Sequence, residues 1–473
     1  MSTQSHSELN SQGVPSTAPT RVWLKNPLAV FDGQTDNLGF RGGVVIENDK
    51  IVETLAAGQT PSVPVDRTLD VSDCVLVPGL VNTHHHFYQT LTRALPDALN
   101  LELFPWLKTL YPYWAGLDDE MISVATELAL AELMLSGCTT ASDHHYVFSN
   151  DTLAAIDAQV SAAKRLGARV TLTRGSMSLG QKSGGLPPES VVQSQEAILL
   201  DSERLVKAYH DDSEGSLVQL ALAPCSPFSV TPEIMKATAD MAKTYQLRTH
   251  THLAETLDEE AFCLQKFGMR TVEYLEHVGW LNNRTWLAHG IHFNDEEIST
   301  LGKAGVGIAH CPSSNMMLAS GSCKVKALEA AGSPVGLGVD GSASNDCSNM
   351  IMEVRQAMYL QRLQYGSANI SHLDALRWGT QGGAAVLGRS DIGSIDVGKQ
   401  ADLALFSLDE LRFSGGHDPL ATLILCGAHK VKHLFVAGQQ KVANFEHTQI
   451  DTQALMAKHK ALANKLIKKR TGA

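Results

Sequence analysis

Three consecutive histidines at the end of an apolar run are the first residues of this chain that could do chemistry. The run GLVNTHHHF covers residues 79–87 and follows Pro78. Side chains alternate between the two faces of a β-strand, so His84 and His86 would share one face while His85 points to the other. Two imidazoles about 6–7 Å apart along a strand can converge on one cation. The H-x-H pattern therefore predicts a metal site rather than a merely polar strand end.

A second H-x-H pattern closes the run LRTHTHLA at residues 247–254. His250 and His252 share one strand face, and the pattern alone leaves open which of them binds a metal. Glu255 follows His252 by three residues and could reach a water bound to that metal. The acidic residues 258–260 are instead typical of a solvated first turn of a helix. We expect Glu255 to be the functional carboxylate of this segment.

Two further segments place a histidine and an aspartate at strand ends. His289 ends the apolar part of LAHGIH at 287–292, and Asp340 ends VGLGVD just before Gly341. A buried aspartate needs a cation or several hydrogen bonds to remain ionised. Four strand ends that carry His or Asp, all on one side of a sheet, together predict a metal centre.

The ligand types indicate which metal this centre would hold. Imidazole and carboxylate ligands without thiolate suit Zn²⁺, and Fe²⁺ or Mn²⁺ are the alternatives. Three imidazoles and one carboxylate leave room for a water molecule, whose pKa a divalent cation lowers from about 15.7 towards 7. The residues therefore predict one divalent metal, Zn²⁺ first, that makes hydroxide available at neutral pH.

The elements that must carry these residues alternate along the middle of the chain. Short apolar runs such as RVTLTR (169–174), LVQLALAP (217–224) and VGIAHC (306–311) are separated by helical stretches such as 119–137, which Gly137 stops. Alternating strands and helices predict parallel strands buried on both faces. A (β/α)₈ barrel fits best, with a doubly wound sheet as the alternative. In a barrel, catalytic residues lie at the C-terminal ends of the strands.

Both ends of the chain are rich in short β-type runs. We expect residues 21–77 and 392–473 to form one small β-sandwich domain, with a helix at its C-terminal end, beside a barrel of residues 78–391. Residues 1–20 are rich in Ser, Thr and Gln, which predicts a disordered tail.

Composition excludes several classes of protein. The 473 residues include 38 basic and 50 acidic ones, a net charge of −12 that argues against a nucleic-acid partner. No stretch approaches the roughly 20 apolar residues of a membrane span, and the N-terminus lacks the apolar region of a secretory signal. The eight cysteines are scattered without a CxxC pair. We expect a cytoplasmic enzyme without membrane partners.

Taken together, the motifs resemble a known family. PGLVNTHHH, HLAET, AHG and GLGVDGSASND are similar to motifs of the mononuclear deaminase and chlorohydrolase branch of the amidohydrolase superfamily. The later segment LGRSDIGSIDVGKQADLALF fits the return of that branch into its small β domain. The similarity spans nearly the whole chain.

The resemblance implies a role for each motif residue. It selects His252 over His250, so that the implied metal ligands are His84, His86, His252 and Asp340. It also implies that Glu255 shuttles a proton and that His289 polarises the substrate and steadies the attacking water. Asp340 would in addition deliver a proton to the departing amine.

The resemblance also indicates a substrate. The stretches at 83–96, 103–114 and 221–233 resemble a bacterial subgroup that converts 8-oxoguanine and water to urate and ammonia. The alternatives on the same scaffold are deaminases of isocytosine, adenosine or pterins and s-triazine hydrolases. A metal-binding protein without activity is a lesser alternative, and Glu255 and His289 count against it.

Substrate contacts are the least determined part of the site. Gln89 follows His86 by three residues, and its amide could pair with the amide edge of a purine. The other candidates, each of which could equally serve packing, are Trp106, Tyr146, Arg174 and Cys225. The family suggests a homo-oligomer.

Overall fold

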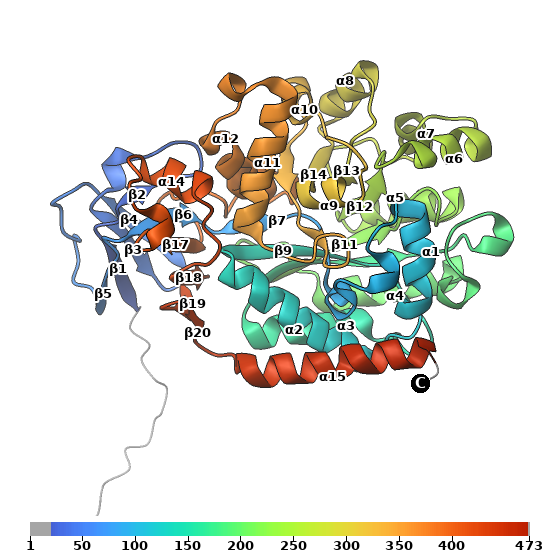
Figure 1. Ribbon diagram of the computed structural model, residues 1–473, viewed down its shortest axis with the longest axis horizontal. Helices are drawn as coiled ribbons and strands as arrows, with labels where there is room; N and C mark the ends of the chain where they lie inside the picture. The colour runs from blue at the N-terminus through green and yellow to red at the C-terminus, as the bar shows by residue number, and fades with distance from the viewer. Residues whose placement is uncertain (1–19, 472–473) are drawn as a thin grey trace, which may run out of the picture.

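A closed barrel of eight parallel strands forms the larger part of the molecule (Figure 1). The computed structural model describes residues 20–471, so the tail predicted for 1–20 lies outside the described residues except for Thr20. Around the barrel the strands follow the order β10-β11-β12-β13-β14-β15-β7-β9. Their bounds are β7 (Leu80–Asn82), β9 (Cys138–His145), β10 (Arg169–Ser176), β11 (Val218–Pro224), β12 (Arg248–Leu253), β13 (Thr285–His289), β14 (Gly307–His310) and β15 (Val335–Leu337). The predicted (β/α)₈ barrel is confirmed, and the doubly wound sheet is wrong.

Helices cover the outside of the barrel. The stretch predicted to be helical over 119–137 is helical over Asp119–Leu135, because Asp118 caps its start by accepting a hydrogen bond from Met121 N and Gly137, at φ 93°, turns the chain into β9. The helices that precede β15, the last barrel strand, are α1 (Leu103–Trp114), α2 (Asp119–Leu135), α3 (Ala155–Leu166), α4 (Gln195–Tyr209), α5 (Pro232–Thr244), α6 (Leu257–Phe267), α7 (Thr271–His277), α8 (Asp295–Ala304), α9 (Pro312–Met317) and α10 (Val325–Ala331). After it come α11 (Met350–Tyr365), α12 (His372–Arg377), the π-helical turn η7 (Trp378–Gly382) and α13 (Gly383–Val386).

Two sheets pack face to face beside the barrel. The first has the order β4-β3-β1-β5 and contains β1 (Arg21–Lys25), β3 (Gly43–Glu47), β4 (Lys50–Leu55) and β5 (Arg67–Asp70). The second has the order β2-β6-β17-β18-β19-β20 and contains β2 (Ala29–Val30), β6 (Cys74–Pro78), β17 (Leu403–Ser407), β18 (His433–Val436), β19 (Gln439–Ala443) and β20 (Glu446–His447). Leu24, Ile46, Leu76, Leu405 and Phe435 share the core between them. Because β6 pairs with β17, the two ends of the chain form one sheet.

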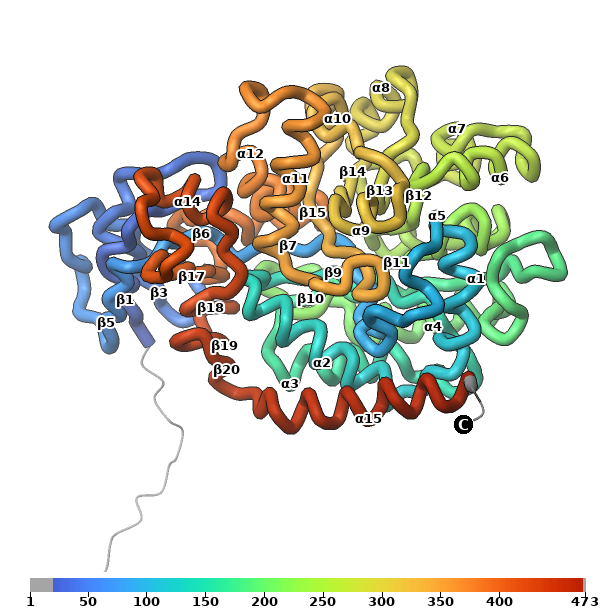
Figure 2. Tube along the Cα trace, in the orientation of Figure 1, coloured from blue at the N-terminus to red at the C-terminus, as the bar shows by residue number. Residues whose placement is uncertain are grey.

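The C-terminal helix leaves this small domain. Helix α15 (Thr452–Thr471) runs along the barrel and packs on α1, α2 and the 3₁₀ helix η2 (Phe87–Thr92) (Figure 2). His459 Nε2 lies 3.0 Å from Thr90 Oγ1, Lys465 Nζ donates to Asp118 Oδ2 at 3.0 Å, and Leu466 is fully buried. The sequence grouped this helix with the small domain, whereas its main contacts are with α1, α2 and η2 beside the barrel.

A buried ion pair joins the barrel to the small domain. Arg169, at the start of β10, donates from Nε to Asp402 Oδ2 at 2.8 Å and from Nη2 to Asp402 Oδ1 at 3.1 Å. Both residues are almost fully buried. Arg169 Nη1 also donates to the carbonyls of Gly215 and Ser216, and Asp402 Oδ1 accepts from Ala437 N at 2.7 Å. The charged atoms of the pair thus all have hydrogen-bond partners, and those between Arg169 and Asp402 cross the boundary.

Removing one partner of this pair should therefore destabilise the protein. We expect Asp402→Ala to lower the free energy of unfolding by about 3–5 kcal/mol, because it leaves the Arg169 charge buried and unpaired. Chemical denaturation measures this difference. The control is Glu120→Ala, which breaks the exposed pair with Lys458 and should change stability by about 1 kcal/mol or less. Equal losses in both variants would contradict the prediction.

Candidate metal centre

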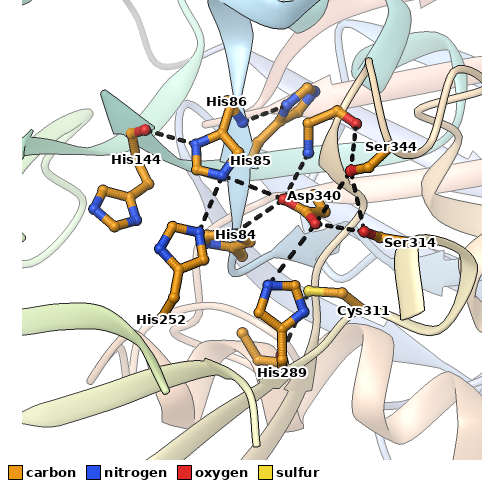
Figure 3. A network of polar contacts seen from close by, with 12 residues as sticks. His84, His85, His86, His144, His252, His289, Cys311, Ser314, Asp340 and Ser344 are labelled. Atoms are coloured by element: carbon orange, nitrogen blue, oxygen red, sulfur yellow. Dashed lines mark hydrogen bonds and ion pairs between the residues drawn. The ribbon is translucent and has the colours of Figure 1, made fainter. Parts of the chain in front are cut away.

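A short two-stranded parallel sheet brings the first and last strand ends together. Strand β8 (His85–His86) pairs with β16 (Asp340–Gly341), and Asp340 N donates to His84 O at 3.0 Å. The side chains of His84, His86 and Asp340 then meet that of His252, which comes from the end of β12 (Figure 3). All four are buried, so these four side chains are brought to one point away from bulk solvent.

The spacing of the four side chains fits a tetrahedral cation site. Their nearest nitrogen and oxygen atoms all lie within 4.8 Å of one another. His86 Nε2 lies 3.2 Å from His252 Nε2 and 3.3 Å from Asp340 Oδ1, and His84 Nε2 lies 3.2 Å from the same oxygen. Ligand bonds of 2.0–2.1 Å in a tetrahedron correspond to edges of about 3.3 Å. The residues present therefore fit a zinc-sized ion.

The tautomers of two imidazoles are fixed by backbone carbonyls. His86 Nδ1 lies 2.7 Å from His144 O, and His252 Nδ1 lies 2.7 Å from Cys225 O. A carbonyl only accepts, so each Nδ1 carries the hydrogen and each Nε2 presents a lone pair. Burial lowers the pKa of His252 to about 3, which keeps the ring neutral. The two Nε2 atoms lie 3.2 Å apart and face the same point, where a cation would bind both.

The third imidazole is oriented by another side chain. His84 Nδ1 contacts His250 Nε2 at 2.8 Å, and His250 Nδ1 contacts Trp286 O at 2.9 Å. Since the Trp286 carbonyl accepts, His250 Nε2 must accept from His84, which leaves a lone pair on His84 Nε2. That nitrogen is buried and has no hydrogen-bond partner among the described residues.

A second cluster could also be considered as a metal site. His84, His144 and His250 offer ligand atoms within 4.8 Å of one another. The 2.8 Å contact between His84 and His250 is, however, shorter than the edge of about 3.3 Å that a shared zinc ion would impose. This cluster is better described as support for His84.

Strained backbone marks the ends of three of the strands. Ala254, His289 and Asp340 have φ values of 54°, 72° and 61°, in the left-handed region that costs a non-glycine residue roughly 1–2 kcal/mol. The strain occurs where the chain must turn a side chain into the centre. Hydrogen bonds around these residues offset its cost.

Residues that the sequence analysis missed supply some of those hydrogen bonds. Ser314 and Ser344 donate from Oγ to Asp340 Oδ2 at 2.6 and 3.3 Å, and His289 Nδ1 lies 2.9 Å from Asn315 Oδ1. Figure 3 shows the two serines on the opposite side of the Asp340 carboxylate from His86. The signal for Ser314 and Asn315 is CPSSN, polar residues immediately after the end of β14.

Glu255 and His289 lie beside the four clustered residues. His289 Nε2 is 3.4 Å from Glu255 Oε2 and 3.9 Å from Asp340 Oδ2. Burial raises the pKa of Glu255. Burial opposes a charge on His289, but the carboxylates of Glu255 and Asp340 raise its pKa above the ordinary value. A carboxylate and an imidazole able to exchange protons therefore face the same space.

That space is a cavity beside the four clustered residues. Four of the predicted substrate contacts line it, namely Gln89, Trp106, Tyr146 and Cys225. Gln89 Oε1 accepts from Ala343 N at 3.3 Å, and Trp106 Nε1 donates to Ala343 O at 3.2 Å. Apolar walls come from Leu103, Leu107, Phe228 and Leu318, and Tyr111, which the sequence analysis did not single out, lines it as well. Largely apolar and aromatic walls with a few polar groups suit a heterocyclic ring.

Arg174 is not among the residues that line the cavity. Its guanidinium donates to Asp201 Oδ2 at 2.8 Å and to Gln193 Oε1 at 3.0 Å, and lies 3.8 Å from the centre of the Phe148 ring. Asp201 belongs to α4, so the side chain points out of β10 towards the helical layer. The expected substrate contact is corrected to a packing and ion-pair role.

The arrangement predicts that His250 controls metal affinity. We expect His250→Phe to weaken zinc binding by about 10–100-fold, because His84 loses the acceptor that fixes its tautomer. Competition with a chromophoric chelator measures the affinity, and circular dichroism verifies the fold. His277→Phe, at an exposed position, is the control. Unchanged affinity in the His250 variant would refute the assigned orientation.

The chain is similar to several known proteins. The model of the amidohydrolase family matches residues 75–441. An 8-oxoguanine deaminase from Pseudomonas aeruginosa is 61% identical over 448 residues, covering 95% of this chain and 99% of that protein. An isoxanthopterin deaminase from an unknown prokaryotic organism is 34% identical, covering 87% and 90%. The crystal structure of an atrazine chlorohydrolase from Arthrobacter aurescens complexed with zinc has a TM-score of 0.87 at 31% identity, covering 93% and 100%.

Proposed function

This chain belongs to the amidohydrolase family, and we propose that it is a hydrolytic deaminase that converts 8-oxoguanine and water to urate and ammonia. The observation that carries the reaction type is the buried group of three imidazoles and one carboxylate with Glu255 and His289 beside it. The identity of 61% to an 8-oxoguanine deaminase over 95% of the chain supports the choice of substrate.

The proposal includes one divalent metal ion. Its ligands would be His84, His86, His252 and Asp340, which supply the donor set that Zn²⁺ prefers. Zinc in the related atrazine chlorohydrolase supports that choice over Fe²⁺ or Mn²⁺. When bound, the ion lowers the pKa of a coordinated water towards neutrality.

The remaining chemistry falls to side chains of this chain. Ionised Glu255 accepts a proton from the attacking water and gives it to the ring nitrogen next to the carbon that carries the exocyclic amine. His289, with Nδ1 held by Asn315, turns Nε2 towards the reacting atoms and polarises the substrate. Asp340 passes the second proton of the water to the amine. The C–N bond then breaks, a carbonyl forms and ammonia leaves, so atoms and charge balance.

Substrate recognition is proposed for the cavity walls. Gln89 would pair with the amide edge of the purine, with Trp106, Tyr146 and Cys225 around the ring. Arg174 has no part in this proposal. A pterin is the second candidate substrate, because the isoxanthopterin deaminase relative also acts on a bicyclic aminoheterocycle and is 34% identical.

We propose that the substrate is a small molecule and not a nucleic acid. We also propose that the enzyme is a homo-oligomer in the cytoplasm. None of the eight cysteines, all of which lie within residues 20–471, is disulfide-bonded, as is usual for proteins of a reducing compartment. Within residues 20–471, no helix is long and apolar enough to cross a bilayer.

An ammonia-release assay on a panel of aminoheterocycles tests the substrate. We expect kcat/KM for 8-oxoguanine to exceed the values for guanine, isoxanthopterin, isocytosine and adenosine at least tenfold, with urate as the product. Metal analysis of the same preparation identifies the ion. A higher value for isoxanthopterin would transfer the assignment to the pterin, and no release from any of them would refute the deaminase.

The role of Glu255 has its own test. We expect Glu255→Gln to reduce kcat by at least about 10³-fold while metal content stays at the wild-type level, because the amide cannot accept the proton of the water. Inductively coupled plasma mass spectrometry measures the metal. The matched control is Glu260→Gln, at a surface carboxylate that pairs with Arg270. An active Glu255 variant would rule out the assignment.

A further inference from the structure

Glu259 is a buried carboxylate that the proposed reaction does not use. Its relative exposure is 0%, whereas its neighbour Asp258 is exposed and its neighbour Glu260 pairs with Arg270. Among the described residues, Glu259 forms no ion pair with Lys, Arg or His. The sequence predicts a solvated first helical turn at residues 258–260, and for Glu259 that prediction is wrong.

The carboxylate of Glu259 is bound to the backbone just ahead of its own helix. Oε1 accepts from Ala254 N at 2.9 Å, and Oε2 accepts from Glu255 N at 3.0 Å. Glu259 is the third residue of α6, whose N-cap is Thr256. In an ordinary capping box, the third residue accepts from the N-cap amide. Here it reaches past the cap to the two residues before it.

These two residues form the strained turn that follows β12. Ala254 has φ 54°, and its carbonyl accepts from Ile291 N at 2.9 Å and His292 N at 3.0 Å, in the loop after His289. An alanine in this conformation is disfavoured by roughly 1–2 kcal/mol, so the turn persists only where its surroundings hold it. Glu259 holds its amides while the loop after β13 holds its carbonyl.

The side chain of Glu255 has little support of its own. Within residues 20–471 its one hydrogen bond to a side chain is the long one from Ser320 Oγ, at 3.4 Å, and His289 Nε2 lies 3.4 Å from its other oxygen. The direction of the Glu255 carboxylate is thus set chiefly by its backbone. Proton transfer depends steeply on such placement, because a misplacement of about 1 Å can cost 10²-fold in rate.

We propose that Glu259 is a positioning residue that clamps the amides of Ala254 and Glu255 and thereby aims the Glu255 carboxylate at the substrate. The inference rests on the proposed function, in which Glu255 transfers the proton. It assigns no chemical step to Glu259, which lies outside the cavity wall.

Steady-state kinetics of the zinc-loaded full chain test the proposal. Glu259→Gln keeps the size of the side chain but turns an NH₂ group towards one of the two amides. We expect kcat for 8-oxoguanine to fall about 10–100-fold, with KM within about threefold of wild type and zinc content unchanged. Glu259→Asp keeps the charge but is one methylene shorter, so its kcat should lie between those of wild type and Glu259→Gln. The matched control, Glu260→Gln, should retain wild-type kcat.

Hydrogen–deuterium exchange gives a readout that is independent of turnover. In the wild type, the amides of Ala254 and Glu255 should be protected, and in Glu259→Gln the exchange of a peptide spanning 253–256 should rise while barrel strands such as β10 stay unchanged. Wild-type kcat in Glu259→Gln, or parallel losses of kcat, substrate affinity and zinc, would overturn the proposal. Unprotected amides in the wild type would overturn it even if neither variant folds.

These measurements distinguish failure of the proposed function from failure of the positioning role of Glu259. If wild-type enzyme releases no ammonia from 8-oxoguanine, the proposed function fails, and the exchange measurement still reports whether the clamp exists. If wild type is active and the exchange data show a clamp but kcat is insensitive to Glu259, only the positioning role fails.

Discussion

Lone pairs that converge without a hydrogen between them are the constraint on which this structure depends. His84, His86 and His252 each turn a bare Nε2 towards Asp340, and each Nδ1 is committed to an acceptor behind it. Two of these acceptors are carbonyls at the ends of β9 and β11. The register of the barrel strands therefore fixes the tautomers. If one strand were shifted by a residue, its carbonyl could no longer accept from the imidazole Nδ1. Correct pairing of the barrel strands is therefore needed both for the fold and for the metal site.

The strained strand ends are the cost of that convergence. A straight strand cannot turn both a ligand and the following residue towards the barrel axis, because successive side chains point to opposite faces. Left-handed residues at Ala254, His289 and Asp340 provide the extra turn. Polar groups from α6 and α9 then hold the turned segments, which explains why buried Glu259, Ser314 and Asn315 surround a site whose chemistry does not need them directly.

Much of this could be predicted from the sequence, for physical reasons that also show where prediction ends. Strand alternation placed His84 and His86 together, and the alternation of strands and helices gave the barrel. The choice of His252 over His250 needed the family, because both lie on the same face and differ only in depth. The prediction for Arg174 is wrong because an apolar run such as that of β10 does not show which of its alternating side chains face the barrel axis.

The predictions for Glu259 and for the C-terminal helix differ from the structure for another reason. A run of acidic residues at a helix start looks alike whether it meets water or folds back on its own turn. Helix α15 combines a basic end with few buried side chains, and only the three-dimensional contacts reveal that it belongs to the barrel. Pattern indicates the type of an element more reliably than its partner.

The pairing of β6 with β17 has a consequence for how the chain is made. Strand β6 leaves the ribosome early, but its neighbour follows more than 300 residues later, which corresponds to roughly 15–65 s at a synthesis rate of 5–20 residues per second. During that time an apolar strand edge waits for its partner. The barrel, which begins two residues after β6, must be synthesised whole before the small domain closes. The apolar edge of β6 is therefore open to wrong pairing for most of the synthesis of the chain.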